Sequence, residues 1–227
     1  MENDDARKVV AEFIGVFTFV FAVVASVGLG ESLGLLGVAL AQGLAIGTMI
    51  SSLGRISGAH FNPAVTLGAL VTRRIEPAIA VAYWIAQLAG AVAAALVVKW
   101  LYPGFLELGS SAPRTSAGTS AFEGLVLEGI LTFFLVWVVF ATAVDPKGTF
   151  GAIAGYGIGL IIAVDILIAG PITGASMNPA RAFGPQLVFS EWPDAWIYYV
   201  GPLIGGVLAA VLYTQLYLAR DDAAATS

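Results

Sequence analysis

The chain has no cysteine and only one histidine among its 227 residues. Disulfide bonds and cysteine-ligated metal sites are therefore excluded. The lone histidine, His60, has no matching cluster of carboxylates, so we expect no metal and no cofactor. An enzyme is the least favoured class, because a nucleophile–histidine–acid arrangement has only this imidazole to use.

Charged side chains are scarce as well. They make up 11% of the chain, whereas soluble domains are about a quarter charged. The net charge of −5 argues against nucleic acid as a partner. Much of it comes from carboxylates near the two ends, namely Glu2, Asp4, Asp5, Asp221 and Asp222.

Long uncharged runs occupy most of the sequence. Residues 125–144 include one carboxylate and residues 200–218 include none. A membrane helix needs about 20 mostly apolar residues to cross about 30 Å of hydrocarbon. We therefore predict an integral, multi-pass membrane protein that lies in a lipid bilayer. The first run follows an acidic head and is too long for a signal peptide, so we interpret it as a retained first helix. The expected spans are about 8–30, 34–54, 77–101, 122–144, 149–168 and 195–219.

The basic residues of the short loops predict the orientation. With the N-terminus inside, seven lie on the inner side and two on the outer side. This bias places both termini in the cytoplasm, and we expect the plasma membrane as the host membrane. The inner residues are Arg7, Lys8, Arg55, Arg73, Arg74, Lys147 and Arg220, and the outer ones are Lys99 and Arg114.

The sequence contains an internal repeat. Asn62-Pro63-Ala64 recurs as Asn178-Pro179-Ala180, an offset of 178 − 62 = 116 residues. Three spans lie in each copy, at about 8–101 and 122–219, so the second copy must enter the membrane from the opposite face. We predict one channel domain over 1–227 with two inverted repeats. The same offset relates Glu12 to Glu128, Ser57-Gly58 to Thr173-Gly174, and Gly90 to Gly206.

Each Asn-Pro-Ala segment predicts a helix start, because asparagine is a good N-cap and proline suits the first turn. The helices expected there, Pro63–Val71 and Pro179–Val188, are about 15 Å long, half of a bilayer. Entering from opposite faces, they would form a broken seventh span whose N-termini meet near the midplane. Residues 56–61 and 170–177 are expected to be non-helical backbone that lines a wet cavity.

Such a pore suits a neutral permeant. Two helix N-termini contribute about half a positive charge each, which disfavours cations, hydronium included. Arg181 follows the second motif and is expected to face the aqueous pathway; a buried ion pair is the alternative. These features predict a passive channel for water that excludes protons and ions.

Other polar residues fall inside the apolar segments. Glu12 and Glu128 are expected to accept hydrogen bonds from N–H groups of the irregular loops, with a proton relay as the less favoured alternative. His60 is either pore-lining or a hydrogen-bonded structural residue. Asp165 is expected to cap or anchor the segment 169–173.

Two segments resemble the signature loops of the major intrinsic protein, or aquaporin, family. They are residues 57–66 (SGAHFNPAVT) and 177–185 (MNPARAFGP), and the resemblance extends from Glu12 to the last helix. It implies an all-α membrane protein with six transmembrane helices plus two re-entrant half-helices. It also implies a homotetramer with a pore in each protomer.

The resemblance also carries over an outer selectivity filter of four positions, Gln42, Ile166, Ala175 and Arg181. Strict water channels of the family have Phe and His at the first two. Gln42 and Ile166 therefore imply a wider constriction and permit ammonia, urea or hydrogen peroxide as additional permeants.

Two further features of the resemblance rank water above glycerol. Ala182 stands where glycerol facilitators have Asp, and Tyr198-Tyr199 resembles an aromatic pair of water-type members. The alternative is a channel mainly for ammonia, urea or hydrogen peroxide. A secondary transporter is remote, since Asp165 alone could serve a coupling ion, and Arg181 opposes an ion channel.

Overall fold

The computed structural model describes residues 3–104, 111–148 and 153–218. Among these residues, six helices are long and apolar enough to cross a membrane. They are α1 (Asn3–Gly28), α2 (Gly30–Ser57), α4 (Pro77–Leu101), α5 (Ala121–Val139), α6 (Ala154–Thr173) and α8 (Ile197–Tyr213). Two five-residue π-helical segments, η2 (Phe140–Val144) and η4 (Thr214–Leu218), continue α5 and α8.

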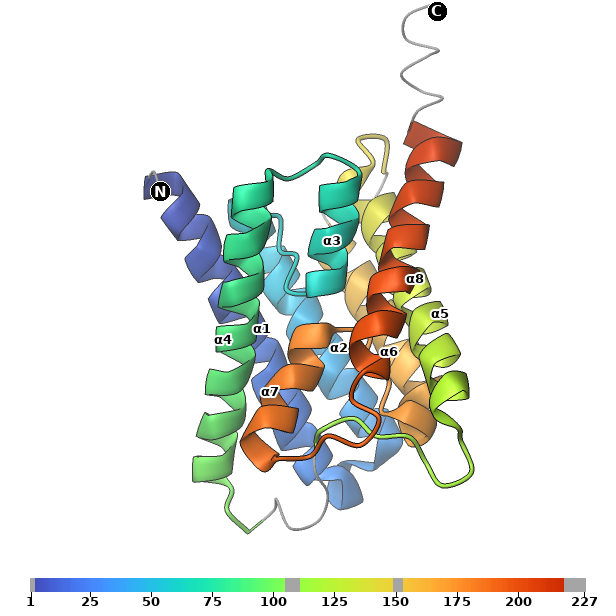
Figure 1. Ribbon diagram of the computed structural model, residues 1–227. Coiled ribbons are helices and arrows are strands. Elements are labelled where there is room, and N and C mark those ends of the chain that lie inside the picture. The colour runs from blue at the N-terminus through green and yellow to red at the C-terminus, as the bar shows by residue number, and fades with distance from the viewer. Residues whose placement is uncertain (1–2, 105–110, 149–152, 219–227) are drawn as a thin grey trace, which may run out of the picture.

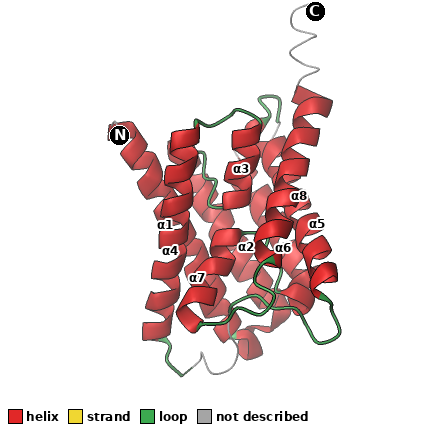
Figure 2. Cartoon of the chain, viewed as in Figure 1, coloured by secondary structure: helices red, strands yellow, loops and turns green. Residues whose placement is uncertain are grey.

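Two short helices lie inside this bundle, α3 (Pro63–Val71) and α7 (Pro179–Phe189). They enter from opposite ends, and their N-terminal tips face each other near the middle (Figure 1). The start of α1 and the end of η4 lie at the same end of the bundle, as expected for an even number of crossings. Helices run along the bundle, most loops lie at its two ends, and the loop before α3 reaches the middle of the bundle (Figure 2). The chain is thus an all-α membrane protein with two inverted repeats.

Local sequence signals explain several helix boundaries. Proline occupies the first turn of α3, α4 and α7, where its missing N–H costs nothing. Ser120 and Glu123 form a capping box at the start of α5. At the other end, α2 and α6 each stop at a left-handed glycine, Gly58 and Gly174, both with φ +85°.

The predicted spans agree with the observed helices to within two residues except at five ends, which are the starts of α1, α2 and α6 and the ends of α2 and α6. Helix α1 begins at residue 3 rather than 8, because two acidic residues suit its first turn and Lys8 Nζ lies 3.0 Å from Asp4 Oδ2. Helix α2 begins at residue 30 and is interrupted at Gly34, where φ is 63° and ψ is 172°. Some of the predictions concern residues outside the described part of the chain. They are the predicted start of the fifth span, at 149–152, and the charged residues Glu2, Arg220, Asp221 and Asp222.

The prediction that residues 170–177 are non-helical was wrong for its first half. Helix α6 continues through Pro171 to Thr173. A proline inside a membrane helix is tolerated when neighbouring groups satisfy the freed backbone, so Pro171 did not end this one. Likewise, α2 includes residues 56 and 57. The irregular loops are therefore short, Gly58–Asn62 and Gly174–Asn178.

Glycines allow the helices to approach closely. Gly43 and Gly47 of α2 face Gly159 and Gly155 of α6, so that a Cβ on Gly43 would collide with the carbonyl oxygen of Gly159. Gly201 and Gly205 of α8 pack in the same way against α5.

Candidate functional site

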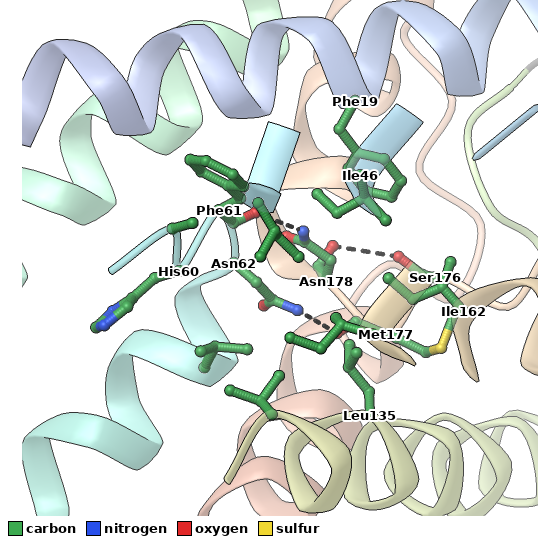
Figure 3. A pocket seen from close by; sticks show the side chains of 15 residues that line it. Phe19, Ile46, His60, Phe61, Asn62, Leu135, Ile162, Ser176, Met177 and Asn178 are labelled. Carbon is green, nitrogen blue, oxygen red and sulfur yellow. Dashed lines mark hydrogen bonds between the residues drawn. The ribbon is translucent and has the colours of Figure 1, made fainter. Parts of the chain in front are cut away.

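The tips of the two half-helices are joined by reciprocal hydrogen bonds (Figure 3). Asn62 Nδ2 donates to the carbonyl of Met177 at 2.9 Å, and Asn178 Nδ2 donates to the carbonyl of Phe61 at 2.8 Å. Each Oδ1 caps its own helix, accepting from Ala64 N at 2.8 Å or from Ala180 N at 3.0 Å. The two asparagines therefore fix both the start of each half-helix and the junction between them.

One donor on each asparagine is left over. A carboxamide carries two N–H groups, and a single one from each asparagine reaches an acceptor among the described residues. Both residues line the central hollow of the bundle. The remaining N–H groups are thus in a position to donate to a molecule inside that hollow.

The loops before the half-helices have unusual backbone conformations. Ala59 and Phe61 have φ of 49°, and their counterparts Ala175 and Met177 have φ of 43° and 54°. Side-chain-bearing residues in the left-handed region cost about 1–3 kcal/mol each and persist only when their surroundings hold them. The holding groups are two buried carboxylates.

Glu12 holds the first loop. Its Oε1 accepts from Ser57 Oγ at 2.7 Å and from His60 N at 2.9 Å. Its Oε2 accepts from Phe61 N at 2.7 Å and from Gln87 Nε2 at 2.8 Å. The side chain is fully buried in the bundle.

Glu128 holds the second loop in the same way. Its Oε1 accepts from Thr173 Oγ1 at 2.7 Å and from Ser176 N at 2.9 Å, and its Oε2 accepts from Met177 N at 2.7 Å. The three donors Thr173, Ser176 and Met177 each lie 116 positions after the corresponding donor to Glu12, which is Ser57, His60 or Phe61. The sequence repeat is therefore also a repeat of hydrogen bonds.

Three hollows follow one another along the bundle. On α2, positions spaced by four line them in order. Gln42 lines the outer hollow, Ile46 the central one, Ile50 both the central and the inner one, and Gly54 the inner one. On α6, Ile166 lines the outer hollow and Ile162 the central one. Residues four apart share one face of a helix, so one stripe of each helix faces this path.

The centre of the path is narrow. The central hollow has a volume of about 30 Å³, and a cavity needs roughly 10–15 Å³ of such volume to hold one water molecule. The central hollow therefore admits roughly two or three waters, beside the leftover donors of Asn62 and Asn178. Apolar side chains, Ile46 and Ile162 among them, form the other part of its lining.

Backbone carbonyls are available on the polar side of the path. The carbonyl oxygens of Gly58, Ala59 and His60 accept no hydrogen bond from the described residues. Gly58 lines the inner hollow, while Ala59 and His60 line the central one. Such oxygens can accept hydrogen bonds from successive water molecules.

Three of the four predicted filter residues meet at the outer hollow. Gln42, Ile166 and Arg181 line it, together with residues 111–117 of the loop before α5. Ala175 is not among the lining residues; it is buried, and its N–H donates to Thr173 Oγ1 at 3.2 Å. The loop contribution is a part of the mouth that the sequence did not indicate.

Arg181 is buried without a carboxylate partner in the described part of the chain. Its Nη2 donates to the carbonyl of Gly174 at 3.2 Å, and its Nη1 reaches no acceptor among the described residues. No described acidic oxygen lies within 4.0 Å of it. The alternative of a buried ion pair thus has no support, and the positive charge stays at the outer constriction.

His60 lies at the edge of the central hollow. Its Nδ1 is 3.1 Å from Thr66 Oγ1, and its ring packs edge-on against Tyr83. The ring points away from Asn62 and Asn178 (Figure 3). His60 therefore lines the path toward the inner side and is also tied to α3.

Several positioning residues were missed by the sequence reasoning. Tyr83 OH donates to the carbonyl of Ser57 at 2.7 Å, and Tyr198 OH donates to that of Thr173 at 2.9 Å, so each tyrosine fixes the end of α2 or α6. Tyr199 OH donates to Gln186 Oε1 at 2.7 Å. The offset of 116 linked Ser57 with Thr173 and could have pointed to their shared role.

The predicted role of Asp165 was wrong. Residues 169–173 are helical and need no anchor, and neither carboxylate oxygen of Asp165 has a hydrogen-bond partner among the described residues. The described ranges also contain no group of three or more His, Cys, Asp or Glu side chains that could hold a metal ion.

Comparison with known proteins gives a consistent result. The model of the family described as "Major intrinsic protein" matches residues 1–213. "Probable aquaporin TIP3-2" of Arabidopsis thaliana is 45% identical over 230 residues, covering 95% of this chain and 85% of its own. "Aquaporin TIP2-1" of Zea mays is 44% identical over 223 residues, covering 93% and 88%.

A solved structure shares the fold. The aquaglyceroporin from Plasmodium falciparum superposes with a TM-score of 0.86, covering 96% of this chain and 99% of its own, at 24% sequence identity. At this identity the likeness concerns the arrangement of helices.

Proposed function

Because the chain belongs to the major intrinsic protein, or aquaporin, family, we propose that it is a passive transmembrane channel for water. As a member of this family it is a channel and not an enzyme, in agreement with the sequence prediction. The junction of the half-helices carries the proposal. A space of about 30 Å³ lies beside two asparagines that each keep one N–H free, which suits a single file of water molecules.

Exclusion of protons and ions is part of the proposal. The N-termini of α3 and α7 meet at the centre, and each contributes about half a positive charge. Arg181 adds a full charge at the outer constriction, with no described carboxylate to neutralise it. A cation would meet two positive barriers, whereas water exchanges its hydrogen bonds with the asparagines and loop carbonyls.

The site residues of this proposal fall into three groups. The central group has the two Asn-Pro-Ala segments, which start the half-helices, and the supporting group holds their loops or lines the path beside them. The outer group is the selectivity filter. The central group is Asn62, Pro63, Ala64, Asn178, Pro179 and Ala180. The supporting group is Glu12, Glu128 and His60. The outer group is Gln42, Ile166, Ala175 and Arg181.

A second function, passage of small neutral solutes, is favoured by one observation. The outer hollow is lined by Gln42 and Ile166 rather than by aromatic side chains. Ammonia, urea and hydrogen peroxide are the solutes that such a constriction favours, either beside water or, as the alternative, as the main permeants.

The assembly and the membrane are proposed on the same basis. We place the whole chain, 1–227, in one channel domain and in a homotetramer with one path per protomer. We propose the plasma membrane as the host membrane. The orientation with both termini in the cytoplasm agrees with the basic residues at the inner end, among which Arg55 lines the inner hollow.

Stopped-flow light scattering on proteoliposomes tests the proposed function. In an impermeant osmolyte, liposomes with the protein should shrink at least tenfold faster than empty ones, with a low activation energy. Shrinkage that matches empty liposomes would reject water as the permeant and move the neutral-solute function to first place.

The double substitution Gln42→Phe/Ile166→His should narrow the outer constriction. We expect urea and ammonia fluxes to fall to the level of empty liposomes, because both new rings project into the outer hollow, while water flux stays within about threefold of the wild type. The fluxes are measured by light scattering and by a pH-sensitive dye. Equal urea and ammonia fluxes in both proteins would place solute selection elsewhere.

A further inference from the structure

Gln42 presents one end of its amide to α1 and the other to the path. Its side chain is 2% exposed, and its Nε2 lies 3.3 Å from Ser26 Oγ. Ser26 is itself 4% exposed and belongs to the last turn of α1. The pair thus connects two helices at the level of the outer hollow.

The direction of this hydrogen bond follows from the bond that Ser26 makes with its own helix. A hydroxyl has one proton to donate, and Ser26 Oγ donates it to the carbonyl of Val23 at 3.2 Å, a common bond for serine inside a helix. Ser26 Oγ can then only accept from Gln42. The partner facing it must be the NH₂ group, which fixes the orientation of the amide.

The amide oxygen is therefore turned toward the path. Gln42 Oε1 accepts no hydrogen bond from the described residues, and it is not one of the enclosed polar atoms that lack a partner. Because Gln42 lines the outer hollow, the space that Oε1 contacts is the one that a permeant crosses. Arg181 Nη1, a donor with no described acceptor, belongs to a residue that lines the same hollow.

We propose that Ser26 is a positioning residue of the outer constriction, which holds the Gln42 amide with its oxygen toward the permeant. The constriction then offers Gln42 Oε1 as an acceptor and the N–H groups of Arg181 as donors. A solute with N–H donors and an oxygen acceptor, such as urea, can use both at once. This inference rests on the proposed channel function and adds a selectivity determinant from α1, outside the four filter positions.

Loss of the Ser26 hydroxyl releases the amide. A net hydrogen bond of this kind changes a conformational equilibrium by about threefold to tenfold. The freed amide turns its NH₂ group toward the path for part of the time, and its N–H groups then oppose the donors of urea. Water donates and accepts equally, so its flux depends much less on this orientation.

The test compares the ratio of urea to water permeability in proteoliposomes. Ser26→Ala is expected to lower the ratio about threefold to tenfold, in the same direction as Gln42→Met, which removes the amide. Ser26→Thr keeps the hydroxyl and should retain the wild-type ratio. If Ser26→Ala does not fold, Ser26→Cys takes its place, because a thiol is a weak acceptor.

Each outcome bears on a different claim. A merely structural role of Ser26 would lower both fluxes together and leave the ratio unchanged, and that result would overturn the inference. A wild-type protein that conducts water but passes no urea above empty liposomes would overturn it as well. A wild-type protein that conducts no water would instead reject the proposed function on which the inference rests.

Discussion

Substitution of Glu128 by leucine should abolish channel activity and destabilise the protein by about 3–6 kcal/mol. The carboxylate accepts three hydrogen bonds, one from Thr173 at the end of α6 and two from the backbone N–H groups of Ser176 and Met177 in the second loop. A buried donor left without a partner costs about 1–3 kcal/mol. The left-handed conformations at Ala175 and Met177 would also lose the group that holds them.

Thermal unfolding in detergent, followed by tryptophan fluorescence, and water flux in proteoliposomes measure this effect. Glu31→Leu provides the control, because Glu31 is an exposed glutamate at the start of α2 and its loss should leave both quantities near the wild-type values. A Glu128→Leu protein that melts and conducts like the wild type would show that the loop keeps its shape without the carboxylate.

Gly43→Ala should be the second severe change, although it adds a single methyl group. The new Cβ would meet the carbonyl oxygen of Gly159 and lie 3.0 Å from the Cβ of Ala163, so α2 and α6 would have to separate. Overpacking usually costs about 1–3 kcal/mol, and we expect the upper end because the neighbour is backbone. Water flux should fall at least fivefold, since Gln42 and Ile166 are carried by these two helices.

Gly54→Ala is a matched control in the same helix. Among the described residues, no atom beyond the adjoining turns of its own helix lies within 4 Å of the Cβ position at Gly54. Alanine is favoured over glycine in a helix by about 1 kcal/mol. This variant should be as stable as the wild type or slightly more stable. Equal melting temperatures for the two alanine variants would mean that close packing of α2 and α6 is not needed.

The sequence predicted the half-helices better than the long spans. The first was predicted as Pro63–Val71 and is observed with the same ends, because an Asn cap and a first-turn proline give a strong local signal. The end of the fifth span was placed at residue 168 instead of 173, because residues 170–177 were expected to be non-helical. The repeat would have corrected this, since Ser57 ends α2 and its equivalent, Thr173, ends α6.

The side-chain contacts could not be predicted to the same extent. Glu12 was expected to bind loop N–H groups, and the structure supplies the partners, 48 and 49 residues away. The bond between Gln42 and Ser26 depends on how α1 and α2 are rotated against each other, which no local pattern specifies. Asp165 was misinterpreted because its expected partner segment turned out to be helical.

The most direct test of the proposed path is a side chain placed inside it. Ile162 lines the central hollow of about 30 Å³. The indole ring introduced by Ile162→Trp is larger than the isoleucine side chain and would fill this hollow. Ile85→Trp is the control, because Ile85 lies on α4 and is 64% exposed on the outside of the bundle. Both variants are reconstituted at equal density, and osmotic shrinkage is recorded by stopped-flow light scattering. We predict that Ile162→Trp shrinks no faster than empty liposomes while Ile85→Trp matches the wild type; fast, wild-type shrinkage of a folded Ile162→Trp protein would contradict a path between the two half-helices.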